Sequence, residues 1–181
     1  LTQRVGYFDT QNGIFFEITG TSVNMVIRSY SSGSIVENRI GQASWNGDTL
    51  LGTGGSSNLS GIELNTEVDQ IFWTDVEWLG VGSVRMGFII NGEYIHCHTF
   101  HHANIGPLGA YMQTACLPLR MEIENTGTTS SSSTYKQICS SVISEGGYTL
   151  TGKPRTVGIE PVGACSKNGR ISRSCKTFDN V

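Results

Sequence analysis

The chain has 181 residues, which suits one domain or one domain with an extension. Charged residues make up 15% of the sequence, below the proportion of about a quarter that is usual, while Gly is abundant at 23 residues. Because long helices need charged residues on their wet faces, this composition favours an all-β domain with many turns. The net charge is −3 and no apolar run has membrane length, so we expect neither nucleic acid nor a membrane as a partner.

The first forty residues predict an antiparallel meander. Asn12-Gly13 is a typical hairpin turn, and Val23, Met25 and Ile27 alternate with polar or smaller residues, as in a half-buried strand. Residues 41–64 lack such a pattern and predict a long exposed connection, a kind of segment in which recognition often occurs. The strands of the meander are expected at residues 4–8, 13–18, 22–30 and 35–40.

The stretch 71–100 carries the densest strand signals of the chain. Tight turns at Gly80-Val81-Gly82 and at Asn91-Gly92 divide it into three predicted strands, and the second turn is the stronger hairpin signal. About ten short strands without a competing helix indicate an all-β fold, an antiparallel β-sandwich of jelly-roll type. Further strands are expected at residues 110–114, 117–125 and 135–144.

We expect the sandwich to occupy residues 1–147. Residues 148–181 show little apolar periodicity and are expected to be a C-terminal extension or the start of a further unit. The chain begins with Leu rather than Met, and its last residues have no stop-like character, so we expect a processed product or a piece cut from a longer polypeptide, truncated at both ends.

The five cysteines have no regular spacing, which argues against a dense disulfide framework. Cys165 and Cys175 flank a short loop and are the candidates for one disulfide in an oxidising compartment. Free thiols in a protein assembled in the cytosol are the alternative, and the sequence leaves both open. There is no C-x-x-C motif, so a structural zinc ribbon is not expected.

His96 and His98 are the candidate metal ligands. They lie two apart on a predicted strand, so we expect both imidazoles on one face, where neutral imidazoles can bind zinc, nickel or iron. The alternative is a histidine pair on the wet face of a hairpin that needs no metal. No carboxylate stands nearby in sequence as a second-shell partner, so we prefer this alternative and expect no cofactor.

Asp75 and Glu77 are the candidate acid pair, two apart on a strand and flanked by tryptophans. Glycosidases with sandwich folds use such pairs, but the plainer interpretation is a strand with one wet face. No G-x-S-x-G elbow and no phosphate-binding glycine loop is present in the sequence. We therefore do not expect an enzyme.

Several longer strings of the sequence form a distinctive set. The strings are Gly13-Ile14-Phe15-Phe16-Glu17, Trp45-Asn46, Glu77-Trp78-Leu79-Gly80-Val81-Gly82, Val84-Arg85-Met86-Gly87-Phe88, His101-His102-Ala103-Asn104, Leu117-Pro118-Leu119-Arg120-Met121-Glu122-Ile123-Glu124-Asn125 and Ile143-Ser144-Glu145-Gly146-Gly147. Together they resemble a module of large virion proteins, known from tailed phages, notably marine cyanophages, and from some large DNA viruses of algae. The resemblance extends over residues 4–147 and implies a place in a virus particle, at the capsid surface, in a fibre or in a tail. The His96-Cys97-His98 string and the Cys165/Cys175 pair are not part of it.

The resulting hypothesis is a virion structural protein that packs against other virion proteins as a homo-oligomer, without catalysis. The alternative is an adhesion module of a viral fibre that binds a carbohydrate or receptor, such as a host-surface glycan, through the loop 46–60 and exposed aromatic residues. Trp45, Trp73 and Trp78 are the candidates for interface or ligand stacking, and these three together with Phe88 and Phe100 are expected as core or interface anchors.

Overall fold

The computed structural model describes residues 1–78, 80–105, 110–125, 127–128 and 132–143. The chain forms two compact units, Leu1–Ser140 and Ser141–Val181. The boundary predicted after residue 147, and the segment that follows it, lie outside the described residues. The fold described below is that of the first unit.

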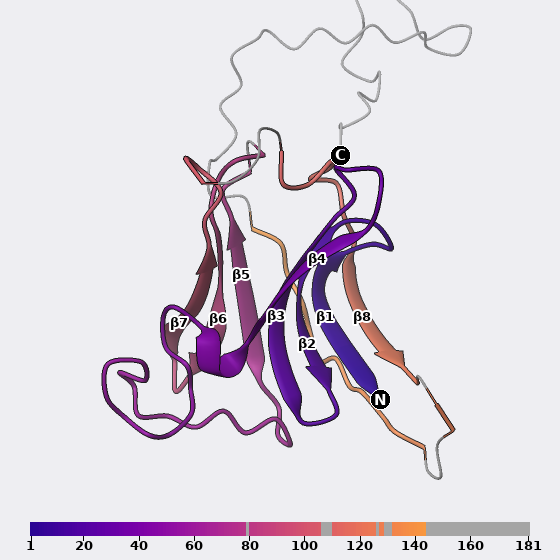
Figure 1. The fold of residues 1–181 in the computed structure, drawn as a ribbon. Coiled ribbons are helices and arrows are strands. Elements are labelled where there is room, and N and C mark those ends of the chain that lie inside the picture. Colours follow the sequence, from indigo (N-terminus) through magenta and orange to yellow (C-terminus); the bar gives the residue numbers. More distant parts are fainter. Residues whose placement is uncertain (79, 106–109, 126, 129–131, 144–181) are drawn as a thin grey trace, which may run out of the picture. The chain divides into compact units, whose positions relative to one another are not determined.

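The first unit consists of two open antiparallel sheets, with one 3-10 turn, η1 (Gln42–Ser44), as the helical element of the described residues (Figure 1). The all-β, antiparallel prediction is therefore confirmed. The five-stranded sheet has the order β4 (Val36–Gly41), β3 (Ser22–Ser29), β2 (Gly13–Thr19), β1 (Thr2–Phe8) and β8 (Leu119–Glu124). The three-stranded sheet has the order β5 (Ile71–Val76), β6 (Val84–Ile90) and β7 (Glu93–Phe100).

The hairpin between β6 and β7 has the turn that the sequence predicts. Asn91 and Gly92 both have positive φ, at 57° and 83°. Two central residues of this kind form a type I′ turn, whose twist matches that of the strands it joins. The predicted Asn91-Gly92 hairpin is confirmed.

The core lies between the facing sides of the two sheets. Side chains alternate along each strand, so every second residue points toward the other sheet. Phe16 of β2 lies against Phe72 of β5 and Phe88 of β6, with ring centroids 5.7 Å and 5.2 Å apart. The buried residues of this core are Ile14, Phe16, Met25, Ile27, Trp45, Leu50, Leu64, Val84, Met86, Phe88, Cys97, Phe100, Met112 and Leu117. We call this side of each sheet the inner face.

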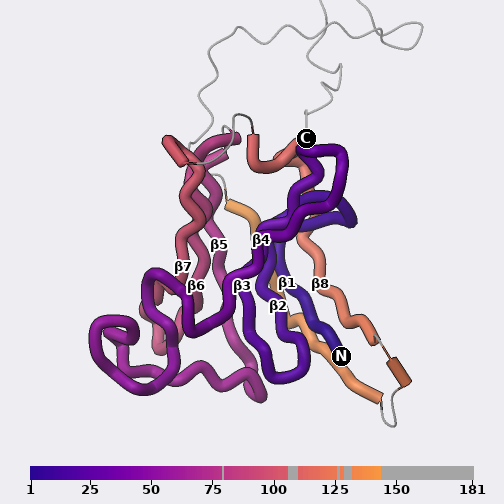
Figure 2. The backbone as a smooth tube through the Cα atoms, viewed as in Figure 1, coloured from indigo at the N-terminus to yellow at the C-terminus, as the bar shows by residue number. Residues whose placement is uncertain are grey.

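The connection from η1 to β5 is a long excursion without a strand of its own (Figure 2). An isolated bridge joins Leu51 to Glu63 at its base. Leu50 and Leu64 return from it into the core. This agrees with the long connection predicted for residues 41–64, although the connection contributes to the core as well as to the surface.

Two predicted strands, 110–114 and 135–144, are not strands in the described residues. Met112 is buried in the core and Tyr111 N–H donates to the Gly80 carbonyl at 2.9 Å, so these residues close the sandwich as a loop. Residues 135–143 pair with neither sheet, and residue 144 lies outside the described part. The sequence pattern of these segments indicates side-chain burial or β-propensity. A strand also requires the edge of a neighbouring strand with which to pair.

Candidate functional site

An aromatic face covers the outer side of the three-stranded sheet; we use this name for Ile71, Trp73, Ile89, Tyr94 and His96. These residues alternate with the inner-face residues of β5, β6 and β7, and therefore point away from the core. The register places Ile71, Ile89 and Tyr94 in one row across the sheet, and Trp73 and His96 in the next. Tyr94 is 72% exposed.

Trp73 lies over Gly87, the residue between it and His96 in the same row. A Cβ atom at position 87 would come within 2.9 Å of Trp73 Nε1 and 2.0 Å of the Ile95 carbonyl oxygen. The ring of Trp73 has its centroid 5.9 Å from that of Tyr94 and 6.4 Å from that of His96. The absent side chain of Gly87 thus provides the space in which the tryptophan is held on the sheet.

A charged row follows the aromatic face along the same side of the sheet. Arg85 Nη2 donates to Asp75 Oδ2 and lies 3.9 Å from Glu77 Oε1. Glu77 also accepts a hydrogen bond from the Ser83 main-chain N–H at 3.2 Å. The acid pair predicted from the sequence therefore does share one face, and Arg85 binds both of its members as an ion-pair partner.

The two candidate metal ligands lie on opposite faces of β7, because Cys97 is an extra residue in that strand. His96 pairs with Gly87 and His98 with Met86, which leaves Cys97 in a β-bulge. His96 shares the outer face with Thr99 and its Nε2 is 2.7 Å from Thr99 Oγ1. The expectation that His96 and His98 face the same side is wrong, since period-two alternation is interrupted between them.

His98 is buried against the core. Its Nδ1 accepts a hydrogen bond from the Asn46 main-chain N–H at 3.2 Å, and its ring contacts the Phe100 ring edge to face, with centroids 4.5 Å apart. Burial, followed by the nearby His96 and His101, lowers the pKa of His98 to about 4. His98 is therefore neutral at pH 7.

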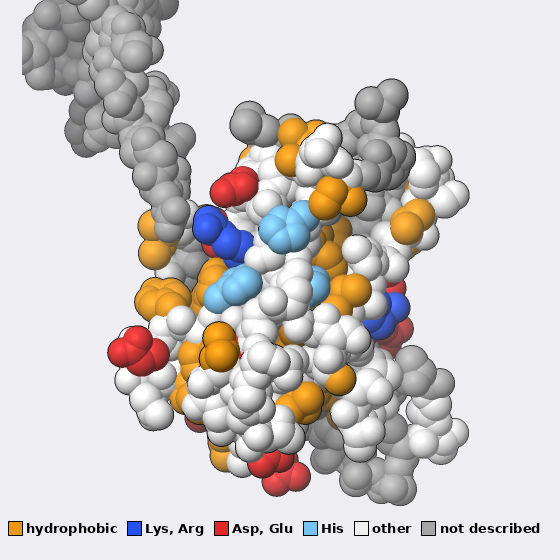
Figure 3. All heavy atoms as spheres, turned by 60° about the vertical axis from the view of Figure 1, so that its left-hand side comes forward, with side chains coloured by type: hydrophobic (Ala, Val, Ile, Leu, Met, Phe, Trp, Pro, Cys, Tyr) orange, Lys and Arg blue, Asp and Glu red, His pale blue; other side chains and the backbone are white. Residues whose placement is uncertain are grey.

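Histidine side chains gather on the side of the molecule where β7 lies, as the pale-blue atoms of Figure 3 show. No three His, Cys, Asp or Glu side chains of the described residues are grouped so as to hold a metal ion. Metal binding by His96 and His98 stays the less favoured of the two interpretations drawn from the sequence. One nitrogen of each imidazole already lies at hydrogen-bonding distance from a protein group.

The outer edge of β7 is covered by residues that follow η1. The Asn46 side-chain amide accepts from the Thr99 main-chain N–H and donates to its carbonyl, both at 2.8 Å. Gly47 N–H donates to the Cys97 carbonyl at 2.8 Å, and Asp48 N–H to the His96 carbonyl at 2.9 Å. We call Asn46–Asp48 the clasp; it occupies an edge that would otherwise be open to another strand.

The outer face of the five-stranded sheet carries a network of arginines and glutamates that crosses all five strands. Glu17 of β2 is at its centre, only 2% exposed, and accepts hydrogen bonds from Arg4 Nε and Arg39 Nε, each at 2.8 Å. Burial would raise the pKa of Glu17, but the hydrogen bonds from Arg39 and Arg4 outweigh it and hold the pKa below its usual value. The network links Arg4, Glu17, Arg28, Glu37, Arg39, Arg120, Glu122 and Glu124.

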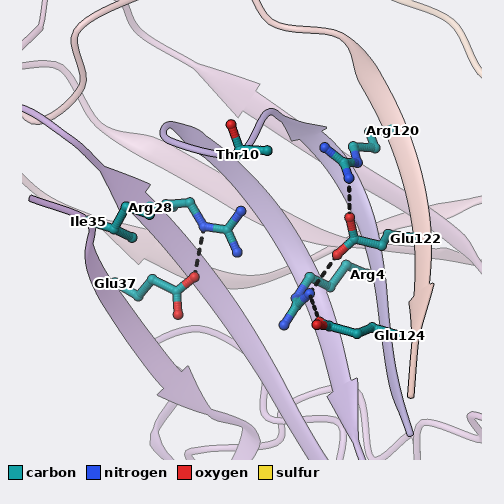
Figure 4. A pocket seen from close by; sticks show the side chains of 8 residues that line it. All are labelled: Arg4, Thr10, Arg28, Ile35, Glu37, Arg120, Glu122 and Glu124. Atoms are coloured by element: carbon teal, nitrogen blue, oxygen red, sulfur yellow. Dashed lines mark hydrogen bonds and ion pairs between the residues drawn. The ribbon is translucent and has the colours of Figure 1, made fainter. Parts of the chain in front are cut away.

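An open depression of about 350 Å³ lies over this network (Figure 4). Arg4 donates to Glu122 at 2.6 Å and to Glu124 at 2.8 Å, and Arg28 donates to Glu37 at 2.8 Å. The four arginines and four glutamates of the network balance in charge, and each arginine is paired. The depression therefore presents no uncompensated charge with which to attract an ion.

A small aromatic cluster beside the network explains the position of two arginines. Phe8 and Phe15 are fully buried although they lie on the outer face, with ring centroids 4.8 Å apart. The guanidinium of Arg28 lies 4.9 Å from the Phe15 ring centre, and that of Arg120 lies 5.3 Å from the Phe8 ring centre. Cation–π contacts and the aliphatic parts of these arginines thus cover the apolar cluster.

The remaining predicted residues are distributed between the core and the surface. Trp45 is buried, stacks on Phe88 and donates from Nε1 to the Ile40 carbonyl at 3.3 Å, so it is a core anchor and presents no stacking surface. Trp78 is half-buried against the core and meets Tyr111 edge to face. The loop predicted for recognition, 46–60, begins with the clasp. Cys165 and Cys175 lie outside the described residues.

Sequence reasoning missed the clasp and the arginine–glutamate network. Trp45-Asn46-Gly47-Asp48 is a turn-like string whose residues give no sign of the strand they cover, in which Thr99 lies 53 residues after Asn46. The network had a weak signal, because charges alternate with apolar residues at Leu119–Glu124. Its partners on β2 and β4 follow only from the strand order.

No protein-family model, no curated protein and no solved structure matches this chain. In the part of the chain that the structure describes, no helix is long and apolar enough to span a membrane.

Proposed function

We propose that this chain is a structural module of a virus particle, which acts by packing against other subunits and not by catalysis. The observation that carries the proposal is an unfinished sandwich. Leu119 and Ile123 of β8 pair with Tyr7 and Gln3, on the side of the sheet that faces the core, yet they are 43% and 42% exposed. The core therefore ends in an open apolar row along β8.

Open apolar rows and free sheet edges are typical of proteins that complete their fold or their surface by association. Ile35 and Val36 at β4, the other edge of this sheet, are also exposed. Burial of apolar area at about 25 cal/mol per Å² would drive the packing. The resemblance of residues 4–147 to virion proteins supports the virus particle as its setting, and a jelly roll is the topology we propose for the completed fold.

The proposal is tested first by sedimentation velocity of the purified protein over a range of concentrations. We expect an oligomer that dissociates on dilution. Immunogold labelling of purified virus particles then tests the setting, and we expect gold at the capsid surface, fibre or tail. A protein that stays monomeric at the highest concentration, or particles that carry no label, would contradict the proposal.

Saccharide binding by the aromatic face is the second candidate function. It is favoured by Tyr94 and Trp73, which present adjacent aromatic rings on a sheet surface beside the hydrogen-bonding groups of Asp75 and Arg85. Aromatic side chains of this kind combine an apolar ring with a polar tip. Binding to a panel of immobilised glycans should be lost in Tyr94→Ala and kept in Leu59→Ala, a matched change at another exposed apolar residue. Equal binding by both variants would remove the candidate.

A further inference from the structure

We propose that residues 135–143 of one chain add as a strand to the free edge of β5 in a second copy of the chain. We call these residues the donor segment. The inference deepens the proposed function and rests on it, since it names the partner and the contact through which the module assembles.

The donor segment has the composition of a β-strand, but it pairs with no strand among the described residues. Tyr135, Ile138, Val142 and Ile143 are aromatic or β-branched. Ile138, Val142 and Ile143 are 82%, 71% and 80% exposed, although most residues of this type are buried in folded domains. No main-chain group of the segment bonds to a sheet within the described residues of its own chain.

The three-stranded sheet offers one edge for such a strand. The clasp occupies the outer edge of β7 through hydrogen bonds to Thr99, Cys97 and His96. β5 is the opposite edge, and its outer side bonds to no main-chain group among the described residues. An extended peptide binds such an edge through main-chain hydrogen bonds, and its side chains give specificity.

A strand on β5 would also fill the unfinished part of the sandwich. The clasp follows β4 along the chain and binds β7, so β7 lies on the β4 side of the sandwich. β5 is at the other end of its sheet, and its Phe72 contacts Phe16 of β2, the strand that lies beside β1 in the five-stranded sheet. A further strand on the free edge of β5 would extend the three-stranded sheet away from the clasp, and on this arrangement it would cover Leu119 and Ile123, the open row of β8.

The second copy is the partner because every chain carries both halves of the contact. One donor segment and one free β5 edge per chain permit a reciprocal dimer or a closed ring, as symmetric homo-oligomers require. Among the described residues of the first unit, residues 135–140 of the donor segment pair with no strand of their own chain. Pairing between copies would provide hydrogen-bond partners for the main chain of the donor segment and for the main chain of the β5 edge at once.

Cys139, an exposed free thiol, makes the contact testable by disulfide trapping. The full chain would carry Cys116→Ser, which removes the other exposed thiol of the described residues, together with Ile71→Cys or Thr74→Cys on β5. Neighbouring strands bring paired Cα atoms to about 5.5 Å, within disulfide reach. After mild oxidation we expect covalent oligomers on a non-reducing gel, which disappear when Cys139→Ser is added.

Leu59→Cys in place of the β5 substitution is the matched control, since Leu59 is exposed and lies elsewhere on the surface. It should give no Cys139-dependent oligomer. A disulfide between Cys139 and β5 that forms within one chain would overturn the second copy as partner. An oligomer without a Cys139-dependent cross-link to β5 would overturn strand addition and leave the proposed function standing, whereas a monomer would overturn both.

A second measurement does not depend on new cysteines in β5. The double variant Ile138→Asp with Val142→Asp changes two exposed residues, so the thermal midpoint of the monomer should not move. The dissociation constant of the oligomer should rise at least tenfold, because a charge in each contact opposes burial of the strand. An unchanged dissociation constant would overturn the proposal.

Discussion

Burial couples the ionisation of His98 to the fold. Its imidazole accepts from Asn46 and lies against Phe100, and its pKa is lowered to about 4 by burial first and by His96 and His101 second. In the unfolded chain the group titrates near its ordinary value of 6.5. Between these two values the unfolded chain binds more protons than the folded chain, so the free energy of unfolding falls as the pH is lowered.

His98→Asn should remove most of this pH dependence. The asparagine carbonyl can still accept the hydrogen bond from Asn46, but it does not titrate. We expect wild-type protein to lose about 3 kcal/mol of stability between pH 6.5 and pH 4, since each pKa unit corresponds to about 1.36 kcal/mol, and the variant to lose much less. Urea unfolding at intervals of half a pH unit measures this loss of stability.

His101→Asn is the control for this measurement, because His101 is exposed and its charge is the smallest of the three causes that lower the pKa of His98. It should retain most of the wild-type pH dependence. A wild-type stability that is flat between pH 6.5 and pH 4 would contradict the assignment of the buried neutral state to His98.

At the scale of the sheet, the carboxylate of Glu17 joins β2 to both β1 and β4. Glu17→Gln removes the charge of the buried carboxylate and takes one partner from each of Arg4 and Arg39, and removal of one member of a buried ion pair is destabilising. We expect a loss of about 3 kcal/mol at pH 7, at the lower end of the range for breaking a buried pair, because both arginines keep other glutamate partners.

Glu124→Gln is the matched control, because the same arginine, Arg4, binds Glu124, which is 51% exposed. An exposed ion pair contributes about 0–1 kcal/mol, so this variant should stay close to wild type. The lowered pKa of Glu17 means that its contribution is present above the ordinary value of 4.5 and is lost as the pH falls through the folded value. Similar losses in both variants would remove Glu17 as the centre of the network.

The elements also show what the sequence could predict. Local signals were sufficient where pairing is local, as in the Asn91-Gly92 hairpin and in the meander from β1 to β4. They were insufficient for His96 and His98, because nothing in the string His96-Cys97-His98 reveals a bulge opposite Gly87. A bulge follows from the fit between two strands and the neighbouring layer, which is a tertiary property.

The same distinction applies to the candidate site. Of the aromatic face, Trp73 and His96 were candidates from the sequence, whereas Ile71, Ile89 and Tyr94 were not. Asp75 and Glu77 were correctly placed on one face. The role of Asn46 was not predictable. Asn46 lies in a loop, and its side-chain amide makes the hydrogen bonds with the Thr99 main chain that a neighbouring strand would otherwise make. Residues 135–143 have the composition of a β-strand, and the sequence therefore predicts one. Whether such a segment pairs depends on a free sheet edge, which the sequence does not reveal.

At the scale of the whole molecule, Cys97 reports when the first unit opens. It lies fully buried at the β7 bulge, and burial raises its pKa to about 12, with the nearby Asp48 adding to the shift. Only the thiolate reacts with alkylating reagents, so Cys97 should react only after the sheets separate. Cys116 and Cys139 are exposed and should react without unfolding of the first unit.

We therefore expect pulse labelling at pH 8, followed by peptide mass spectrometry, to give two fast sites among the described residues and one protected site. The labelling of Cys97 should increase with urea along the same curve as the loss of tryptophan fluorescence, since Trp45 and Cys97 belong to one core. Labelling of Cys97 well before that transition would mean that β7 separates from the rest of the sandwich on its own. In that case the clasp, and not the core, would limit the stability of the three-stranded sheet.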